Sequence, residues 1–203
     1  MKLAAVVLAG GAGERFGGAK LAAPLGGRSL LAFALDAAAA AADDIIVVAG
    51  PNLAELALAW SRCAGREVRM VAAPDKGEGM GGSLRVGLAA AGAGVDGVFV
   101  FLGDMPFVPL AIPRKLADAL AGGAAAAAPA HRGRRGHPVL LGLRLIAQRA
   151  RIGGDRGAAD LLAIETGLVL IDTDDDGVLF DVDTPDDLAE AVRRLAQAGS
   201  PSA

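Results

Sequence analysis

Aromatic residues and cysteine are nearly absent from this 203-residue chain. Aromatic side chains make up 3% of the sequence, with no tyrosine, whereas 53% of the residues are hydrophobic. The core must therefore be built from alanine, leucine and valine. The single cysteine, Cys63, excludes an internal disulfide and leaves no cysteine metal cluster. The length suits one sizeable domain and is short for two.

Excess positive charge and long apolar segments are also missing. The formal net charge is −3, which argues against a nucleic-acid partner because surfaces that bind nucleic acid are normally basic. No apolar run reaches membrane-spanning length, and the N-terminus lacks a signal-peptide pattern. We therefore expect a cytoplasmic protein without a membrane partner. Residues 1–197 are expected to form one domain, and residues 198–203 a flexible tail.

Short apolar runs alternate with longer helical patterns along the chain. The predicted strands are 3–9, 44–49, 67–72, 96–102, 124–129, 137–141 and 167–171. The predicted helices are 29–42, 52–64, 83–91, 109–121, 143–151, 156–165 and 184–197. This order predicts an α/β fold with a mainly parallel central sheet and helices on both faces. Because ligands of such sheets bind beyond the carboxyl ends of the strands, the segments that follow strands are the candidate site.

A glycine-rich stretch follows the first predicted strand. Glycine lets the backbone approach a ligand and turn its N–H groups toward an anion. Lys20 ends the stretch, in a chain with only four lysines, and a lysine is suited to reaching a phosphate. The stretch predicts a polyphosphate site, and the alternative is a surface turn with incidental charge. Its glycines and cations are Gly10, Gly11, Gly13, Arg15, Gly17, Gly18 and Lys20.

The spacing of these glycines excludes two common phosphate-binding loops. A P-loop needs Gly-x-x-x-x-Gly-Lys-Ser/Thr, but Gly18 is followed by Ala19 and no hydroxyl follows Lys20. The dinucleotide motif Gly-x-Gly-x-x-Gly needs its third glycine one position before Gly17. An NAD-dependent oxidoreductase would also need an acidic ribose ligand after the second strand, where residues 49–51 read Ala-Gly-Pro. Both motifs fail.

Three later segments also follow predicted strands or precede a helix. Gly79 to Ser83 is a second glycine loop, either placed near a base or sugar or an ordinary helix entry, with Ser83 as N-cap. Asp104 ends an apolar strand, where it either binds Mg²⁺ or forms an Asx turn. Asp183 shares a face with Asp181 in extended chain and is predicted as a second metal ligand.

The densest positive charge lies at 131–137, which reads HRGRRGH. This segment is either a solvated hairpin turn or an acceptor site for an anionic substrate, with His137 at the mouth of a strand. Asp155 opens a similar ambiguity, because it could serve only as an N-cap for the helix predicted after it.

Taken together, these segments resemble the MobA-like nucleotidyltransferase family, most closely its molybdenum-cofactor cytidylyltransferases. The resemblance covers nearly the whole chain. It implies a single Rossmann-like nucleotidyltransferase domain that uses Mg²⁺ to transfer CMP from CTP to molybdopterin cofactor, with release of pyrophosphate. The segments that carry it are LAGGAGERFGGAK (8–20), GEGMGGSLRVGL (77–88), GDMP (103–106), GHPVL (136–140), GDRGA (154–158) and DVDTPDDL (181–188).

The resemblance also implies roles for residues. Arg15, Lys20 and Asp104 are the expected catalytic residues, the first two on the triphosphate and the third on the metal. His137 and Asp155 are expected toward the acceptor, and a molybdoenzyme or chaperone is implied as a protein partner. The expected nucleotide contacts are Leu8, Ala9, Gly10, Gly11, Gly13, Arg15, Lys20, Gly79, Ser83 and Asp104.

Several alternatives remain open from the sequence. Gly11 stands where cytidylyl members often carry alanine and is commoner in the guanylyl branch, so CTP and GTP are both candidates. The acceptor could also be another phosphorylated compound, such as a phosphosugar. A nucleotide-binding regulatory protein without turnover is the non-enzymatic alternative.

Overall fold

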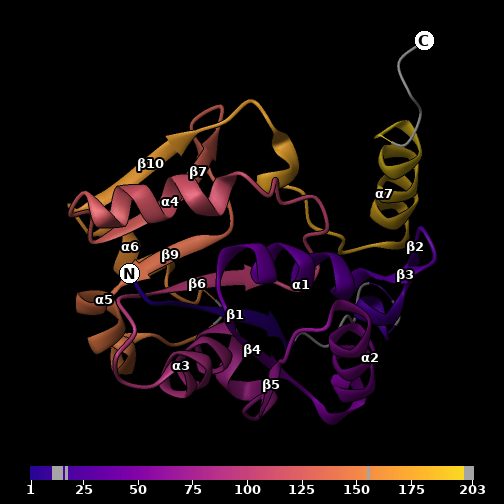
Figure 1. Ribbon diagram of the computed structural model, residues 1–203, viewed down its shortest axis with the longest axis horizontal. Coiled ribbons are helices and arrows are strands. Elements are labelled where there is room, and N and C mark those ends of the chain that lie inside the picture. The colour runs from indigo at the N-terminus through magenta and orange to yellow at the C-terminus, as the bar shows by residue number, and fades with distance from the viewer. Residues whose placement is uncertain (11–15, 17, 155, 199–203) are drawn as a thin grey trace.

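Strand β1 (Leu3–Ala9) lies in the middle of the sheet, and the other strands are arranged on both sides of it (Figure 1). The computed structural model describes residues 1–10, 16, 18–154 and 156–198. β1 pairs in parallel with β4 (Asp44–Ala49) and with β6 (Gly97–Leu102). β5 (Arg69–Ala72) continues the parallel arrangement beyond β4. The three buried strands predicted at 3–9, 44–49 and 96–102 are therefore neighbours.

The other half of the sheet is mixed. β9 (Val139–Gly142) runs antiparallel to both β6 and β7 (Ala126–His131), and β10 (Leu168–Asp172) lies parallel to β7 at the edge. The short β8 (Arg134–Arg135) folds back on the end of β7. The strand order is β10-β7-β9-β6-β1-β4-β5. This mostly parallel α/β architecture confirms the fold predicted from the sequence.

Helices cover both faces of the sheet, as Figure 1 shows for α1 and α3 on opposite sides of β1. No helix among the described residues is long and apolar enough to cross a membrane. A small hairpin, β2 (Pro24–Leu25) and β3 (Arg28–Ser29), lies apart from the main sheet. The helices are α1 (Leu30–Ala41), α2 (Ala54–Ala64), α3 (Gly79–Ala91), α4 (Ile112–Ala121), α5 (Leu143–Ala147), α6 (Ala159–Ala163) and α7 (Pro185–Ala198).

The two faces of β1 belong to two different hydrophobic cores. Ala5 and Val7 pack in the core that α1 and α4 complete, whereas Val6 and Leu8 pack in the core that α3 and α6 complete. Side chains alternate between the faces of a strand, so one continuous apolar strand serves both layers. Alanine and glycine allow close helix packing in place of the missing aromatic side chains.

Several predicted helix boundaries are wrong. α3 begins at Gly79, four residues before the predicted start, so Ser83 lies inside the helix and is not its N-cap. The backbone N–H of Gly81 instead donates to the carbonyl of Gly154 at 2.7 Å. A distant carbonyl thus satisfies one of the first-turn N–H groups that an N-cap would otherwise address. The predicted helices 143–151 and 156–165 are also shorter, because α5 and α6 each span five residues.

Gly87 is where α3 lies closest to the sheet. A Cβ atom at Gly87 would lie 2.5 Å from Cγ1 of Val6 and 3.0 Å from Cγ2 of Val48. We predict that Gly87→Ala destabilises the protein by about 1–3 kcal/mol, because overpacking outweighs the better helix propensity of alanine. Urea unfolding measures the change. Gly77→Ala is the matched control, since nothing lies within 4 Å of its Cβ position. Equal stability of the two variants would contradict this packing.

Candidate active site

The candidate site lies where β1 and β6 end side by side. Leu8 of β1 pairs with Leu102 of β6, and the N–H of Gly103 donates to the carbonyl of Leu8 at 2.9 Å. This bond fixes the turn after β6 against the end of β1. Asp104 therefore comes directly beyond the carboxyl ends of two central parallel strands, where ligands of such sheets bind.

A tight reversal of the backbone directs Lys20 back toward the sheet. Gly18 has a φ of 98° and Ala19 a φ of 48°, both in the left-handed region. For an alanine this conformation costs roughly 1–2 kcal/mol, and such local strain is found mostly at functional sites. Leu21 is buried directly after the turn and anchors it in the core.

Lys20 lies between two carboxylates from distant parts of the chain. Its Nζ is 2.7 Å from Oδ2 of Asp104 and 2.9 Å from Oδ1 of Asp183, and the Lys20 side chain is only 11% exposed. Burial by itself lowers the pKa of Lys20, but the charges and hydrogen bonds of Asp104 and Asp183 outweigh it and raise the pKa above its usual value. The structure thus brings together three residues that the sequence predicted for one site.

Asp183 is held in place by the chain around it. The neighbouring Val182 is fully buried, and its N–H donates to the backbone carbonyl of Asp104 at 3.0 Å. On the other side, the Asp187 carboxylate accepts the N–H of Asp183 and, with the Thr184 hydroxyl, caps the start of α7. These contacts confirm Thr184 to Asp187 as a helix start. The Asp183 carboxylate contacts Lys20.

One oxygen of Asp104 has no partner. Oδ1 is buried and makes no hydrogen bond with the residues that the structure describes, an arrangement that is costly unless another group approaches the oxygen. A divalent cation such as Mg²⁺ prefers carboxylate oxygens and is commonly held by one or two carboxylates together with substrate phosphates. Within the described residues no three His, Cys, Asp or Glu side chains gather as a metal cluster. Asp104 and Asp183 therefore fit a site that nucleotide oxygens complete.

Asp181 is a site residue to which sequence analysis assigned no role. Although the residue is exposed, partial burial of its carboxyl and the negative charges of Asp183 and Asp104 raise its pKa. The spacing of Asp181 two residues before Asp183 was the signal present in the sequence. The effect of the Asp104 charge on the pKa of Asp181 depends on the fold. The carboxylates of Asp104, Asp181 and Asp183 therefore all interact electrostatically with the Lys20 ammonium group.

Cavities flank the end of β1. One of about 340 Å³ lies beyond the carboxyl ends of β1, β4 and β5, and it has the size of a small-molecule pocket. Its walls include Ala9, Gly10, Lys20, Gly50 and Ala73. A second, of about 60 Å³, is lined by Leu8, Met80 and His137 among others.

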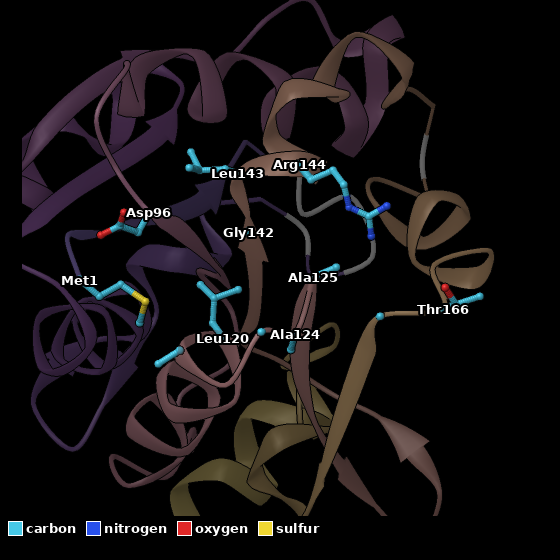
Figure 2. Close-up of a pocket in the computed structure, with 12 residues that line it drawn as sticks. Met1, Asp96, Leu120, Ala124, Ala125, Gly142, Leu143, Arg144 and Thr166 are labelled. Carbon is cyan, nitrogen blue, oxygen red and sulfur yellow. The ribbon is translucent and has the colours of Figure 1, made fainter.

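A larger cavity lies at the opposite edge of the sheet. It has a volume of about 690 Å³ and is lined by Met1 and Asp96, which precede β1 and β6, together with Ala125, Gly142 and Arg144 (Figure 2). This edge holds the amino ends of the parallel strands, away from the Lys20 cluster. Because this cavity lies away from Lys20, Asp104 and Asp183, it is not the candidate active site despite its size.

The predicted glycine contacts have specific neighbours. A Cβ atom at Gly10 would lie 3.2 Å from both Ala73 Cβ and Ser83 Oγ, so Ser83 packs behind the first glycine of the stretch. A Cβ atom at Gly81 would lie 2.5 Å from the backbone of Gly153. At least one glycine of the second loop therefore serves packing between segments. Gly79, with a φ of 62°, starts α3.

His137 lies at the inner end of the 131–137 segment. Its backbone N–H donates to Val178 O at 2.9 Å, and its Nδ1 faces Val100 O at 3.4 Å. Burial lowers the pKa of His137 and outweighs the opposing hydrogen bond to Val100, while the Arg135 charge lowers the pKa further and the Asp104 charge opposes it least. The imidazole is therefore neutral at neutral pH. Gly11, Gly13, Arg15 and Asp155 lie outside the described residues.

Comparison with known families agrees with this geometry. The family model described as MobA-like NTP transferase domain matches residues 5–173. The matched range includes Lys20 and Asp104 but ends before Asp183, so the place of Asp183 rests on the structure. No curated protein sequence matches the chain.

Solved structures are similar over almost the full chain. The Rv0371c homologue from a Mycobacterium species is 29% identical, with 96% of this chain and 100% of that chain covered and a TM-score of 0.79. The manganese complex of Rv0371c from Mycobacterium tuberculosis is 27% identical, with 95% and 99% covered and a TM-score of 0.75. Molybdopterin-guanine dinucleotide biosynthesis protein A from Archaeoglobus fulgidus shares the fold at 21% identity, with 97% and 100% covered and a TM-score of 0.64.

The Lys20 bridge predicts a pH dependence of stability. Because the pKa of Lys20 is raised on folding, its contribution is complete below the unfolded lysine pKa of about 10.4 and is lost as the pH rises through the folded value. The difference in unfolding free energy between the wild type and Lys20→Met should therefore shrink above that pH. Denaturant unfolding across alkaline pH measures it, and Lys115→Met, an exposed site on α4, is the control. A difference that stays constant would contradict the bridge.

Proposed function

The chain belongs to the MobA-like NTP transferase family of nucleotidyltransferases, and we propose that it transfers CMP from CTP to the phosphate of molybdenum cofactor, with release of pyrophosphate. The observation that supports this most is the meeting of Lys20, Asp104 and Asp183 at the carboxyl edge of the sheet. The unpartnered Oδ1 of Asp104 adds a reason for a metal there. We treat residues 1–197 as one functional unit, because the segment before α7 contributes Asp183 to the site. The hydrogen bond from Val182 N–H to Asp104 O holds that segment against the end of β6.

Asp104 and Asp183 would hold Mg²⁺. When bound, the ion would neutralise phosphate charge and polarise the α-phosphate. Lys20 contacts Oδ2 of Asp104, whereas Oδ1 of the same carboxylate makes no hydrogen bond with any residue that the structure describes. The carboxylate can therefore serve the lysine through one oxygen and a metal through the other. Manganese in the Rv0371c structure supports the choice of a divalent ion.

The nucleotide would occupy the cavity of about 340 Å³ that Lys20 lines. Ala9 and Gly10 form its wall beside β1, where the missing side chain of Gly10 lets a ligand lie against the backbone. Lys20 would bind the triphosphate and stabilise the charge on the departing pyrophosphate. Arg15, from the same stretch, is proposed to share this role.

The reaction joins an acceptor phosphate oxygen to the α-phosphorus and breaks the bond between the α-phosphorus and the bridging oxygen. That oxygen leaves with the β- and γ-phosphates as pyrophosphate. An acceptor phosphate is already ionised at neutral pH, so no general base is required. Positioning and charge neutralisation would then supply the catalysis. The neutral His137 fits a contact with the acceptor and not a second cation.

Two other acceptor and base choices fit the same site. Gly11 favours the guanylyl branch, in which GTP would replace CTP and the product would be the guanine dinucleotide. A phosphosugar could replace the cofactor as acceptor. A regulatory protein would bind nucleotide without releasing pyrophosphate, but the combined presence of Lys20, Asp104 and Asp183 favours an enzyme.

Calorimetric titration of CTP and GTP in the presence of Mg²⁺, followed by pyrophosphate release with molybdenum cofactor, tests this proposal. We expect tighter binding of CTP and pyrophosphate release that requires the acceptor. Preference for GTP would support the guanylyl alternative, and release only with phosphosugars would change the acceptor. Nucleotide binding without release for any acceptor would contradict the enzymatic proposal.

Replacement of Asp104 tests the metal assignment. We predict that Asp104→Asn lowers turnover by a factor of about 10²–10³ while the fold is retained, because the substitution removes a charge that holds the metal. Initial rates of pyrophosphate release and circular dichroism measure the two effects. Asp186→Asn is the control, since Asp186 lies exposed in the first turn of α7. Wild-type turnover in Asp104→Asn would disprove the assignment.

A further inference from the structure

A small cavity on the α3 side of β1 combines an apolar wall with two arginines. Its volume is about 60 Å³, and its wall includes the buried side chains of Leu84, Val139 and Leu162. Apart from His137, the charged or polar side chains at this cavity are Arg135 and Arg156. The arginines come from separate segments, one from β8 and one from the turn before α6. Arg135 lies in the 131–137 segment that the sequence offered as an acceptor site, but neither arginine was itself assigned a role.

This cavity lies on the face of β1 opposite the cavity of about 340 Å³ that Lys20 lines. Leu8 lines the small cavity and Ala9 lines the cavity of about 340 Å³, and successive residues of a strand point to opposite faces. The two cavities therefore flank the end of β1. His137 of the small cavity is near enough to feel the charge of Asp104. A ligand there would lie at the end of β1, on the face opposite the cavity proposed for the nucleotide.

The arginines supply the positive charge of the small cavity. His137 contributes none, because burial lowers its pKa and favours the neutral ring, whose Nδ1 faces the Val100 carbonyl. Arg135 makes no side-chain hydrogen bond or ion pair within the described part of the chain. Among the described residues, Arg156 pairs only with Asp160 at 3.1 Å, and both side chains are about 70% exposed. An exposed pair of this kind is weak, so both guanidinium groups are available to an anion.

We propose that Arg135 and Arg156 bind the phosphate of the acceptor and thereby determine which acceptors the enzyme accepts. This inference rests on the proposed function and deepens it. A guanidinium group presents paired N–H donors that match a phosphate, and two of them suit a doubly charged phosphate monoester.

Steady-state kinetics of pyrophosphate release with molybdenum cofactor tests the assignment. We expect Arg135→Gln and Arg156→Gln each to raise the KM for the cofactor about tenfold, since each removes a charge-assisted contact. The KM for CTP should stay unchanged. Arg134→Gln is the matched control, because Arg134 neighbours Arg135 on β8 but lines a different cavity, with Asp176 and Phe180. Arg151→Gln, an exposed site that pairs with Gln148, is the second control.

A binding measurement separates this inference from catalysis. Calorimetric titration of inorganic phosphate into protein saturated with CTP and Mg²⁺ should show one site in the wild type and in both controls. The Arg135→Gln/Arg156→Gln double variant should lose it. Retained phosphate binding in the double variant, or no saturable binding in the wild type, would overturn the inference.

The two proposals fail differently. If CTP does not bind, or no acceptor supports pyrophosphate release, the proposed function fails. If CTP binds and pyrophosphate is released, but the arginine variants keep the wild-type KM for the acceptor, only the role of Arg135 and Arg156 is disproved. Circular dichroism of each variant excludes loss of fold as the cause of a change.

Discussion

The site depends on one buried ammonium group that joins two distant carboxylates. Asp104 and Asp183 are separated by most of the second half of the chain, and the Nζ of Lys20 lies within 3 Å of an oxygen of each. Without that cation, the carboxylates of Asp104 and Asp183, with Asp181 nearby, would repel one another at the carboxyl edge of the sheet. The cluster therefore requires the glycine-rich stretch, the end of β6 and the segment before α7 to meet at one point.

This constraint explains features that are otherwise unrelated. Ala19 adopts a left-handed conformation directly before Lys20, and the buried Val182 donates a backbone hydrogen bond to Asp104 directly before Asp183. The first feature positions Lys20, and the second positions Asp183. One carboxylate oxygen in the cluster, Oδ1 of Asp104, is buried without a hydrogen bond to any described residue. Every other buried side-chain oxygen among the described residues has a hydrogen-bond partner. The position beside Oδ1 therefore suits a metal ion.

Much of this arrangement could be predicted from the sequence, because its signals are local. Continuous apolar runs identified β1 and β4 to the residue, and the residue types after β1 and β6 pointed to Lys20 and Asp104. The rest depends on long-range contacts. The start of α3 at Gly79 goes with the Gly154 carbonyl, and Arg135 and Arg156 line one cavity although they come from β8 and the turn before α6. No pattern within either segment reports those contacts.

The central claim is that Asp104 and Asp183 together hold the metal of the nucleotide complex. Electron paramagnetic resonance titration of Mn²⁺ in the presence of CTP tests it most directly, because bound and free Mn²⁺ give different signals. We expect one Mn²⁺ per chain in the wild type and in Asp175→Asn, and about tenfold weaker binding in both Asp104→Asn and Asp183→Asn. Wild-type affinity for Mn²⁺ in Asp183→Asn would contradict the claim.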